Sequence, residues 1–485
     1  MKILGIETSC DETAAAVVED GVRLLSNVVS SQMDDFARYG GVIPEIAARS
    51  HIEAMLPVVE KALAEAGCTW DDIDAIGVTY APGLIGSLMI GTLTARTLAH
   101  LKHKPLYAVH HVEGHVYANF LTKIGRGEEL AMSNEGEIPV DGKTERAKDR
   151  EKLHASQLIV SARPAEDSVT QRGAIATHGV SPTPQAGEAP CKELSEAGLA
   201  DTISLQQSGS GTAGLQLPKL QPQFPLLALI VSGGHTQLAL FYGHGDYVLL
   251  GQAQDDAVGE AFDKVAKIIG LPYPGGVSIS KRAPKGNSQA FDFPKASLPC
   301  PPGCTHEINT PVDDRYDGPV IRGGRGEVFA RNRCHRYDFS FSGVKTAVLR
   351  AVQSACGVDH TFPSKDLPGR VSDGLRADVA ASFQRTAVET LVDKTILAYR
   401  DYSPASVVIA GGVAANAELR RQLREALPID IEYAPMSLCT DNAAMIASLA
   451  YFMAQSVQPA DPYTLEAIPA LSMTKTAWNT LALEP

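Results

Sequence analysis

The sequence has few cysteines, no long apolar run and fewer basic than acidic residues. Eight cysteines are scattered along 485 residues with no secretory leader, which predicts a reducing compartment and mostly free thiols. No apolar segment is long enough to span a bilayer. Residues 1–6 already look like a buried strand, which leaves no room for a transit peptide. These absences predict a cytoplasmic protein without a membrane anchor.

The charge balance limits how the chain can meet nucleic acid. Its 43 basic and 56 acidic residues give a net charge of −13, which argues against a broad basic surface that binds nucleic acid. Any such contact must be local or shared with a partner. The 44% hydrophobic and 20% charged content is that of an ordinary globular protein with sizeable cores. The length predicts two or three domains.

Two stretches lack apolar periodicity. Residues 122–223 are rich in Ser, Thr, Gly, Pro, Ala, Gln and Glu, and residues 297–337 combine prolines with a mixture of Gly and Arg. Such segments bury too little apolar surface to offset the entropy of ordering. Ordered patterns resume at residues 225 and 338. We therefore predict two disordered insertions in a compact α/β protein.

His111 and His115 are four residues apart. In a helix both imidazoles lie on one face, where they can bind one metal ion. In the zinc-peptidase pattern H-E-x-x-H the glutamate directly follows the first histidine. Here Val112 follows, and Glu113 is roughly 200° around the helix from His111. The pattern indicates a metal-anchored binding site rather than a peptidase; the alternative is two polar histidines near a helix start.

Two apolar strands run into small polar turns and return, at residues 3–18 and 227–241. Small residues in such turns let backbone N–H groups converge on an anion. One such hairpin is common, but two suggest two related domains that face a phosphate-binding cleft. A third strand, residues 407–410, ends in paired glycines before a helix, and ligands approach that edge of open α/β sheets. A plain strand-turn-helix is the alternative for this loop.

Several helices are predicted from apolar spacing, at residues 44–66, from about 84 to 102, and at 255–269. The last one carries Asp263, which could bind a ligand hydroxyl or be a solvated acid. Asp441 precedes an apolar helix, so it is a natural N-cap. It is also a carboxylate that could complete a two-histidine metal site.

Eight motifs occur in order: GIETSCDET from Gly5, HHVEGH from His110, VSGGHT from Val231, GEAFDK from Gly259, YPGG from Tyr273, FSFSG from Phe339, GGVAAN from Gly411 and DNAAM from Asp441. This series resembles the tRNA N6-adenosine threonylcarbamoyltransferase family, once described as O-sialoglycoprotein endopeptidases. The resemblance covers about residues 1–121 and 224–451, apart from the second insertion.

The resemblance implies an actin/Hsp70/sugar-kinase-like (ASKHA) α/β fold of two duplicated lobes around a central nucleotide cleft. The first lobe is residues 1–121, completed by about 436–456; the second is 224–435, interrupted by 297–337; residues 457–485 are a tail. The implied reaction is an acyl transfer. A threonylcarbamoyl group passes from threonylcarbamoyl-AMP to N6 of the adenosine after the anticodon, in tRNAs that read codons beginning with A. The products are N6-threonylcarbamoyladenosine and AMP.

Motif matching also assigns residue roles. The metal ligands would be His111, His115 and Asp441, with Fe²⁺ the first expectation and Zn²⁺ the second. Asp11 and Glu12 would be the acids near the transfer step. The nucleotide would be bound by a larger set from the second lobe: Ile230, Val231, Ser232, Gly233, Gly234, Asp263, Gly276 and Asn416.

The expected partners are tRNA, threonylcarbamoyl-AMP and accessory proteins, namely a paralogous ASKHA subunit and a small P-loop ATPase. The alternative functions are a metallopeptidase and a non-catalytic nucleotide-binding ATPase partner. The second insertion adds two further expectations. One is a structural zinc site, weighed against a disordered loop, from Cys300, Cys304, His306, Cys334 and His335. The other is a basic contact with tRNA phosphate, weighed against a solvated loop, through Arg322, Arg325, Arg331, Arg333 and Arg336.

Overall fold

The computed structural model describes residues 1–33, 36, 41–122, 217–218, 221–296, 298, 321–322, 328–329, 335–431 and 433–475. Residues 1–130 and 205–485 form one compact unit. The other unit, residues 131–204, lies outside the described residues. Within the described ranges, no helix combines the length and apolarity that crossing a bilayer requires.

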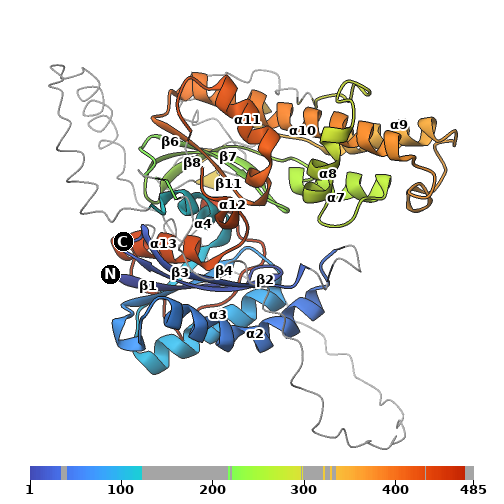
Figure 1. Cartoon of the computed structure of the whole chain (residues 1–485). Helices are drawn as coiled ribbons and strands as arrows, with labels where there is room; N and C mark the ends of the chain where they lie inside the picture. The colour runs from blue at the N-terminus through green and yellow to red at the C-terminus, as the bar shows by residue number, and fades with distance from the viewer. Residues whose placement is uncertain are drawn as a thin grey trace, which may run out of the picture. The chain divides into compact units, whose positions relative to one another are not determined.

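The first sheet is built from five strands: β1 (Lys2–Glu7), β2 (Glu12–Glu19), β3 (Arg23–Ser31), β4 (Ala75–Ala81) and β5 (Leu106–His110). Their order is β3-β2-β1-β4-β5, and Figure 1 shows this sheet nearly edge-on in the lower part of the view. β1 and β2 form an antiparallel hairpin, whereas β4 and β5 run parallel to β1. All of β1 after Lys2 is buried, as expected for a central strand covered on both faces.

The second sheet repeats this plan. Its strands are β6 (Leu226–Val231), β7 (Thr236–Gly243), β8 (Asp246–Gln252) and β11 (Ser406–Ala410). The order is β8-β7-β6-β11, again with an antiparallel hairpin first and a parallel strand on its other side. The shared order confirms the expected α/β fold of two duplicated lobes. The exact boundaries of the lobes stay predictions.

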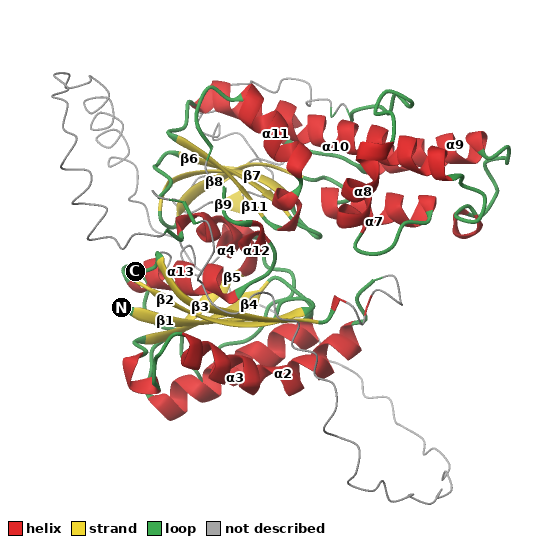
Figure 2. Ribbon diagram, viewed as in Figure 1, coloured by secondary structure: helices red, strands yellow, loops and turns green. Residues whose placement is uncertain are grey.

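Helices cover both faces of the first sheet (Figure 2). On one face lie α2 (Pro44–Glu65) and α3 (Ile85–Lys102), and on the other lies α13 (Ala443–Ala454). Because side chains alternate along a strand, Leu4 and Ile6 join the core beside α2 and α3, while Ile3 joins the core that contains α13. This confirms the helices predicted at residues 44–66 and up to 102. It also brings a late segment of the chain onto the first strand.

The helices of the second lobe are α7 (Val258–Ile269), α8 (Gly275–Arg282), α9 (Ser342–Ala355), α10 (Asp373–Tyr402) and α11 (Ala417–Ala426). The helix predicted from residue 255 begins later, at Val258. Two aspartates ahead of its start make side-chain contacts instead. Asp255 accepts hydrogen bonds from Ser340 and from the Phe341 N–H, and Asp256 pairs with Lys264 and Lys345.

Little of the second insertion is described. Two short strands, Ile321–Arg322 (β9) and Val328–Phe329 (β10), pair antiparallel, and His335–Tyr337 forms a 3-10 turn. His335 contacts Asp338 at 2.8 Å, and the guanidinium of Arg336 pairs with Asp401 at 2.9 Å. The other candidate zinc ligands lie outside the described residues, as do Arg325, Arg331, Arg333 and the side chain of Arg322. The first insertion lies outside them except near its ends.

The chain after α13 lies along the first lobe. The Ala460 N–H donates to the carbonyl of Leu106 at 2.7 Å, and the Ile468 N–H donates to that of Tyr80 at 2.8 Å. His110 Nε2 then meets the carbonyl of Leu471 at 3.1 Å. The segment predicted as a tail therefore contacts both ends of β5 and the carboxyl end of β4.

Gly5 of β1 lies where α13 crosses the strand. A Cβ at this position would be 2.3 Å from the carbonyl oxygen of Ala443 and 2.8 Å from the nitrogen of Ala447. We expect Gly5→Ala to lower the free energy of unfolding by about 1–3 kcal/mol through overpacking, measured by urea denaturation. The control is Gly374→Ala in α10, where nothing lies within 4 Å. It should be neutral or stabilising by up to about 1 kcal/mol, and equal losses in both variants would contradict this prediction.

Candidate metal centre

The two histidines lie on helix α4 (His111–Tyr117), which follows β5 directly and confirms the predicted helical pair. All seven residues of α4 are buried. The imidazole centroids of His111 and His115 are 4.6 Å apart and the rings are inclined by 72°. Both rings therefore lie on one side of a buried helix, as the spacing predicts.

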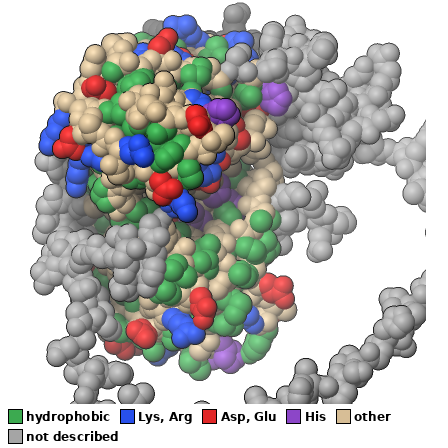
Figure 3. Space-filling view, turned by 90° about the vertical axis from the view of Figure 1, so that its right-hand side faces the viewer, with side chains coloured by type: hydrophobic (Ala, Val, Ile, Leu, Met, Phe, Trp, Pro, Cys, Tyr) green, Lys and Arg blue, Asp and Glu red, His purple; other side chains and the backbone are tan. Residues whose placement is uncertain are grey.

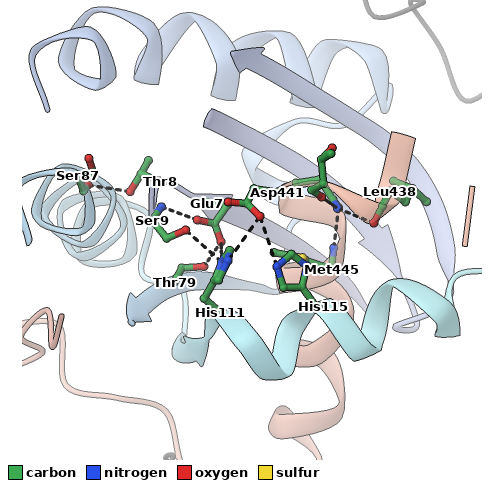
Figure 4. A network of polar contacts seen from close by, with 12 residues as sticks. Glu7, Thr8, Ser9, Thr79, Ser87, His111, His115, Leu438, Asp441 and Met445 are labelled. Carbon is green, nitrogen blue, oxygen red and sulfur yellow. Dashed lines mark hydrogen bonds and ion pairs between the residues drawn. The ribbon is translucent and has the colours of Figure 1, made fainter. Parts of the chain in front are cut away.

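Asp441 completes the group from a distant part of the chain. The expectation that it caps the following helix is wrong, because Asn442 is the N-cap of α13 and accepts from the Met445 N–H at 3.1 Å. Asp441 is therefore outside the helix. One of its carboxylate oxygens lies 3.5 Å from His111 Nε2 and 3.4 Å from His115 Nε2 (Figure 4).

The geometry of the trio fits a cation. One ligand atom from each of His111, His115 and Asp441 lies within 4.8 Å of the others. In a tetrahedral site with bonds of about 2.1 Å, neighbouring ligand atoms are about 3.4 Å apart. The measured separations of 3.4 and 3.5 Å match that edge. Within the described residues, neither ring nitrogen of buried His115 makes a hydrogen bond, so this imidazole has a lone pair to offer to an ion.

Glu7 orients His111 from the end of β1. Its carboxylate accepts from His111 Nδ1 at 3.0 Å, from the Thr79 hydroxyl at 2.6 Å and from the Ser9 N–H at 2.5 Å. Because Nδ1 faces this acceptor, Nε2 of His111 is the nitrogen turned toward Asp441. The reading of the sequence missed Glu7. The sequence signal for it is an acid at the end of an otherwise apolar strand, and the structure shows that this acid is fully buried.

Burial and charge set the protonation of the trio. Burial alone would lower the pKa of His111, but the carboxylates of Asp441 and Glu7 outweigh it and raise this pKa to about 9. Burial raises the pKa of Asp441 to about 6, although His111 opposes this. Burial, and then the charge of His111, lowers the pKa of His115 well below its usual value. The metal-free group thus carries a proton on His111, and His115 is neutral.

Metal affinity should rise with pH. A cation must displace the proton on His111 Nε2, so affinity should increase about tenfold per pH unit from pH 6 up to the pKa of about 9 and then level off. Below about pH 6 the Asp441 carboxyl also takes up a proton, so the slope should steepen. Competition titrations with Zn²⁺ at several pH values measure this slope. If the affinity for Zn²⁺ did not change between pH 6 and 9, the proposed ligand set would be contradicted.

Glu113 does not join the trio. It is buried, and its charge adds to the effect of burial in raising the pKa of Tyr80 to about 12. It is not one of the three side chains whose ligand atoms converge. Val112, which takes the place of the catalytic glutamate in the peptidase pattern, is buried in the core. The glutamate that the peptidase pattern places directly after the first histidine is therefore replaced by an apolar side chain.

Asp11 and Glu12 lie near the trio, where the turn after β1 leads into the first residue of β2. Both side chains are buried. Burial, and then the charges of Asp11 and Asp441, raise the pKa of Glu12 well above its usual value. The charge of Asp11 likewise contributes to the raised pKa of Asp441. The structure thus brings both predicted acids into the electrostatic field of the candidate ligands.

The predicted nucleotide residues gather at the carboxyl ends of β6 and β11, which are parallel neighbours. Ile230 and Val231 end β6, and the Ser232–Gly234 turn follows. A Cβ on Gly233, Gly234 or Gly276 would meet nothing within 4 Å, so these backbone positions are open. At Gly411, with φ of +88°, a Cβ would lie 2.5 Å from the carbonyl oxygen of Val231. The two strand ends therefore approach through a glycine.

Asp263 and Asn416 already have structural partners. The Asp263 carboxylate accepts from the Gly275 N–H at 2.7 Å. The Asn416 carbonyl caps α11, accepting from the N–H groups of Glu418 and Leu419, while its amide donates to Ser280 at 3.0 Å. Both residues shape the loops at this edge, and their contact with a nucleotide stays a prediction.

His235, which the sequence reading did not single out, connects the turn to the trio. The backbone N–H of His235 donates to the Ser232 hydroxyl at 3.1 Å. Burial, and then the charge of His111, lowers the pKa of His235 to about 4. The turn after β6 therefore lies within the electrostatic reach of the metal ligands.

Comparison with known proteins gives one consistent family. The family model described as tRNA N6-adenosine threonylcarbamoyltransferase matches residues 23–191 and 211–448. A protein of that name from Thermomicrobium roseum is 39% identical over 468 residues, covering 95% of this chain and 94% of its own. Another, from Dehalococcoides mccartyi, is 37% identical over 476 residues, covering 98% and 100%.

Among solved structures, component A of (R)-2-hydroxyglutaryl-CoA dehydratase from Acidaminococcus fermentans is similar with a TM-score of 0.38. It is 11% identical, and the match covers 94% of this chain and 98% of that one. The assignment of the fold therefore rests on the strand orders of the two sheets.

Proposed function

Because the chain belongs to the tRNA N6-adenosine threonylcarbamoyltransferase family, we propose that it is an acyltransferase that modifies tRNA. It moves a threonylcarbamoyl group from threonylcarbamoyl-AMP to N6 of the adenosine after the anticodon. The near-complete match to proteins of this name supports the reaction. The observation that best supports a functional site in this chain is the convergence of the side chains of His111, His115 and Asp441.

The donor is a mixed anhydride, so its carbonyl carbon is already activated. The amine of adenosine forms the new C–N bond, the bond from that carbon to the phosphate oxygen breaks, and AMP leaves with the electron pair. The amine must also lose a proton. We assign Glu12 as the acceptor, because burial and neighbouring acids raise its pKa and so make its carboxylate a stronger base. Asp11 on the same turn would orient the amine.

The open turn after β6 supports binding of the adenylate. Gly233 and Gly234 leave room for close approach to the backbone, and backbone N–H groups of such turns suit a phosphate. The glycine pair after β11 lies at the same sheet edge. We assign the phosphate to the Ser232–Gly234 turn and the rest of the nucleotide to the start of α8 at Gly276 and to Asn416, the N-cap of α11.

Two imidazoles and one carboxylate are a ligand set used by Fe²⁺ and by Zn²⁺. We propose Fe²⁺ as the resident ion and Zn²⁺ as the alternative. His111, His115 and Asp441 would bind it, with Glu7 behind His111. A divalent cation would supply positive charge that polarises donor oxygens. Metal analysis of protein purified without air tests the identity of the ion.

The decisive experiment incubates the purified chain with threonylcarbamoyl-AMP and unmodified tRNA, followed by mass spectrometry of the nucleosides. Appearance of N6-threonylcarbamoyladenosine is the expected result. Adding the accessory proteins covers the case in which the chain alone is slow. ATP turnover without modified tRNA would favour the nucleotide-binding alternative, and chelator-sensitive cleavage of proteins would favour the peptidase.

We further propose that an accessory subunit covers an apolar surface on α2 and α3. Five large apolar side chains make up this surface, and along each helix they recur every four residues. Each is between 47% and 62% exposed: Ile52, Leu56, Ile85, Met89 and Leu93. The face shown in Figure 3 carries hydrophobic side chains over its lower part, where the first lobe lies. Large apolar side chains exposed on two neighbouring helices suit an interaction site, and we propose the paralogous ASKHA subunit as the occupant. We propose that the small P-loop ATPase and tRNA bind elsewhere, and that the protein modifies tRNA in the cytoplasm.

Leu56→Asp combined with Met89→Asp should abolish capture of the paralogous subunit in a co-purification assay. Both side chains are exposed, 58% and 48%, so the unfolding temperature should stay within a few degrees. Tyr242→Asp, at an exposed site on β7 of the second sheet, is the control and should leave binding unchanged. Unaltered capture by the double variant would reject this surface.

A further inference from the structure

His51 is a fully buried histidine on α2 that is not one of the candidate metal ligands. Its ring lies against the turn that joins β1 to β2, the turn that carries Asp11 and Glu12. His51 Nε2 is 3.1 Å from the carbonyl oxygen of Cys10, and His51 Nδ1 is 2.8 Å from the Thr13 hydroxyl. The ring therefore contacts the turn on both sides of the two acids.

These contacts fix which nitrogen carries the proton. A backbone carbonyl only accepts, so Nε2 must donate to Cys10. In a neutral imidazole Nδ1 then accepts, and the Thr13 hydroxyl is its donor at 2.8 Å, with the Gln32 amide at 3.4 Å. Burial lowers the pKa of His51, against opposing effects of the Cys10 carbonyl and of the carboxylates of Glu7 and Asp11. The neutral form with one defined tautomer therefore dominates near neutral pH.

Other elements form hydrogen bonds with the backbone of the same turn. The Leu84 N–H donates to the carbonyl of Ser9 at 2.8 Å, the Ser87 hydroxyl to that of Cys10 at 3.2 Å, and the Gln32 N–H to that of Asp11 at 3.0 Å. Three successive carbonyls of the turn are thus fixed by the end of β3, by α3 and by the segment before it. Two of these partners also bind a side chain: the Ser87 carbonyl accepts from the Thr8 hydroxyl at 2.9 Å, and His51 contacts the Thr13 hydroxyl on the far side of the two acids.

We propose that His51 is a positioning residue that, with its proton on Nε2, fixes the turn from Cys10 to Thr13 and so places Asp11 and Glu12 for the transfer step. This rests on the proposed function, because the acids matter only if they serve the transfer. The competing account is a histidine that merely fills the core. The two accounts predict different effects of replacing His51. If it only fills the core, its replacement lowers stability; if it positions the acids, its replacement lowers the turnover rate.

The test compares matched pairs in the full-length protein. His51→Leu fills similar space without either hydrogen bond, whereas His51→Gln keeps a donor for the Cys10 carbonyl. Thr13→Val removes the hydroxyl with its shape nearly kept, whereas Thr13→Ser retains it. We expect His51→Leu and Thr13→Val to lower kcat about 10–100-fold, the range for a misplaced catalytic group. KM for tRNA and Zn²⁺ affinity should stay within about twofold, because the metal ligands lie on other elements. His51→Gln and Thr13→Ser should recover most of the turnover.

A second measurement does not depend on transfer. In ¹⁵N-histidine NMR spectra, the signals of His51 are identified as those that disappear in His51→Gln. In the wild type these signals should show a protonated Nε2 and an unprotonated Nδ1 from pH 6 to 8. The backbone amides of Asp11 and Glu12 should shift in His51→Leu and Thr13→Val but not in Thr13→Ser. Unshifted amides in His51→Leu, or a kcat loss that follows Zn²⁺ affinity, would overturn the proposal. If the wild type transfers nothing while the amides shift as expected, the proposed function fails and the contact between His51 and the turn stands.

Discussion

Replacing His111 and His115 together by alanine should abolish both cation binding and threonylcarbamoyl transfer. The two imidazoles are two of the three converging ligands, and Asp441 alone offers only one carboxylate. A cation that polarises the donor is worth several kcal/mol of barrier, so we expect transfer to fall at least about 10³-fold. Metal analysis and single-turnover transfer assays measure the two losses.

The control for this variant is His360→Ala, an exposed histidine in the segment that follows α9. Among the described residues, only its backbone carbonyl takes part in hydrogen bonds, accepting from Arg350 and Gln353, so both metal content and transfer should match the wild type. Added Zn²⁺ or Fe²⁺ should not rescue the double variant. Wild-type transfer by a metal-free double variant would refute the assignment of this centre.

Glu7→Gln should weaken metal binding about 10–100-fold, as loss of the partner behind a ligating histidine does. Both carboxylate oxygens of Glu7 receive donors, from Ser9 on one side and from Thr79 and His111 on the other. A glutamine at this position would place its NH₂ group, a donor, opposite one of these donors. We also expect a loss of about 1–3 kcal/mol in the free energy of unfolding from the buried mismatch. Chelator competition and urea denaturation measure the two effects.

This variant should differ from the double histidine variant in one respect. Its three ligands remain, so excess metal should restore transfer to near the wild-type rate. Glu45→Gln, a highly exposed glutamate paired with Arg49 on α2, is the matched control and should change stability by less than about 0.5 kcal/mol. Unchanged metal affinity in Glu7→Gln would mean that Glu7 does not orient His111.

The sequence predicts features that depend on near neighbours. The pair His111 and His115 is readable because a helix fixes the direction of side chains four residues apart. The α2 helix is readable from its proline start and from Gly67, which follows the helix with φ of +62°. The two hairpins are readable from apolar runs that end in small residues. In each case the period of one element carries the information.

Pairing across long distances is where the sequence was insufficient. Asp441 offered two equal chemical roles, a cap or a ligand, and only resemblance favoured the ligand. The structure shows that Asn442 caps α13 and that Asp441 lies between the imidazoles. Glu7 and His111 are 104 positions apart, so no local period could pair them. His51 and Cys10 are 41 positions apart and meet through a carbonyl, which has no signature in the sequence.

By itself, then, the sequence determined the two-lobed α/β class, the helices and hairpins and, through its ordered motifs, the family. Tertiary structure decided which buried polar groups meet: Asp441 with the two histidines, Glu7 behind His111, and His51 beneath the turn of Asp11 and Glu12. The reason is physical. Helical and strand periods follow from backbone geometry over a few residues, whereas contacts between distant polar groups are set by how β1, α2, α4 and α13 pack together, because a buried polar group must find its partner where packing places one.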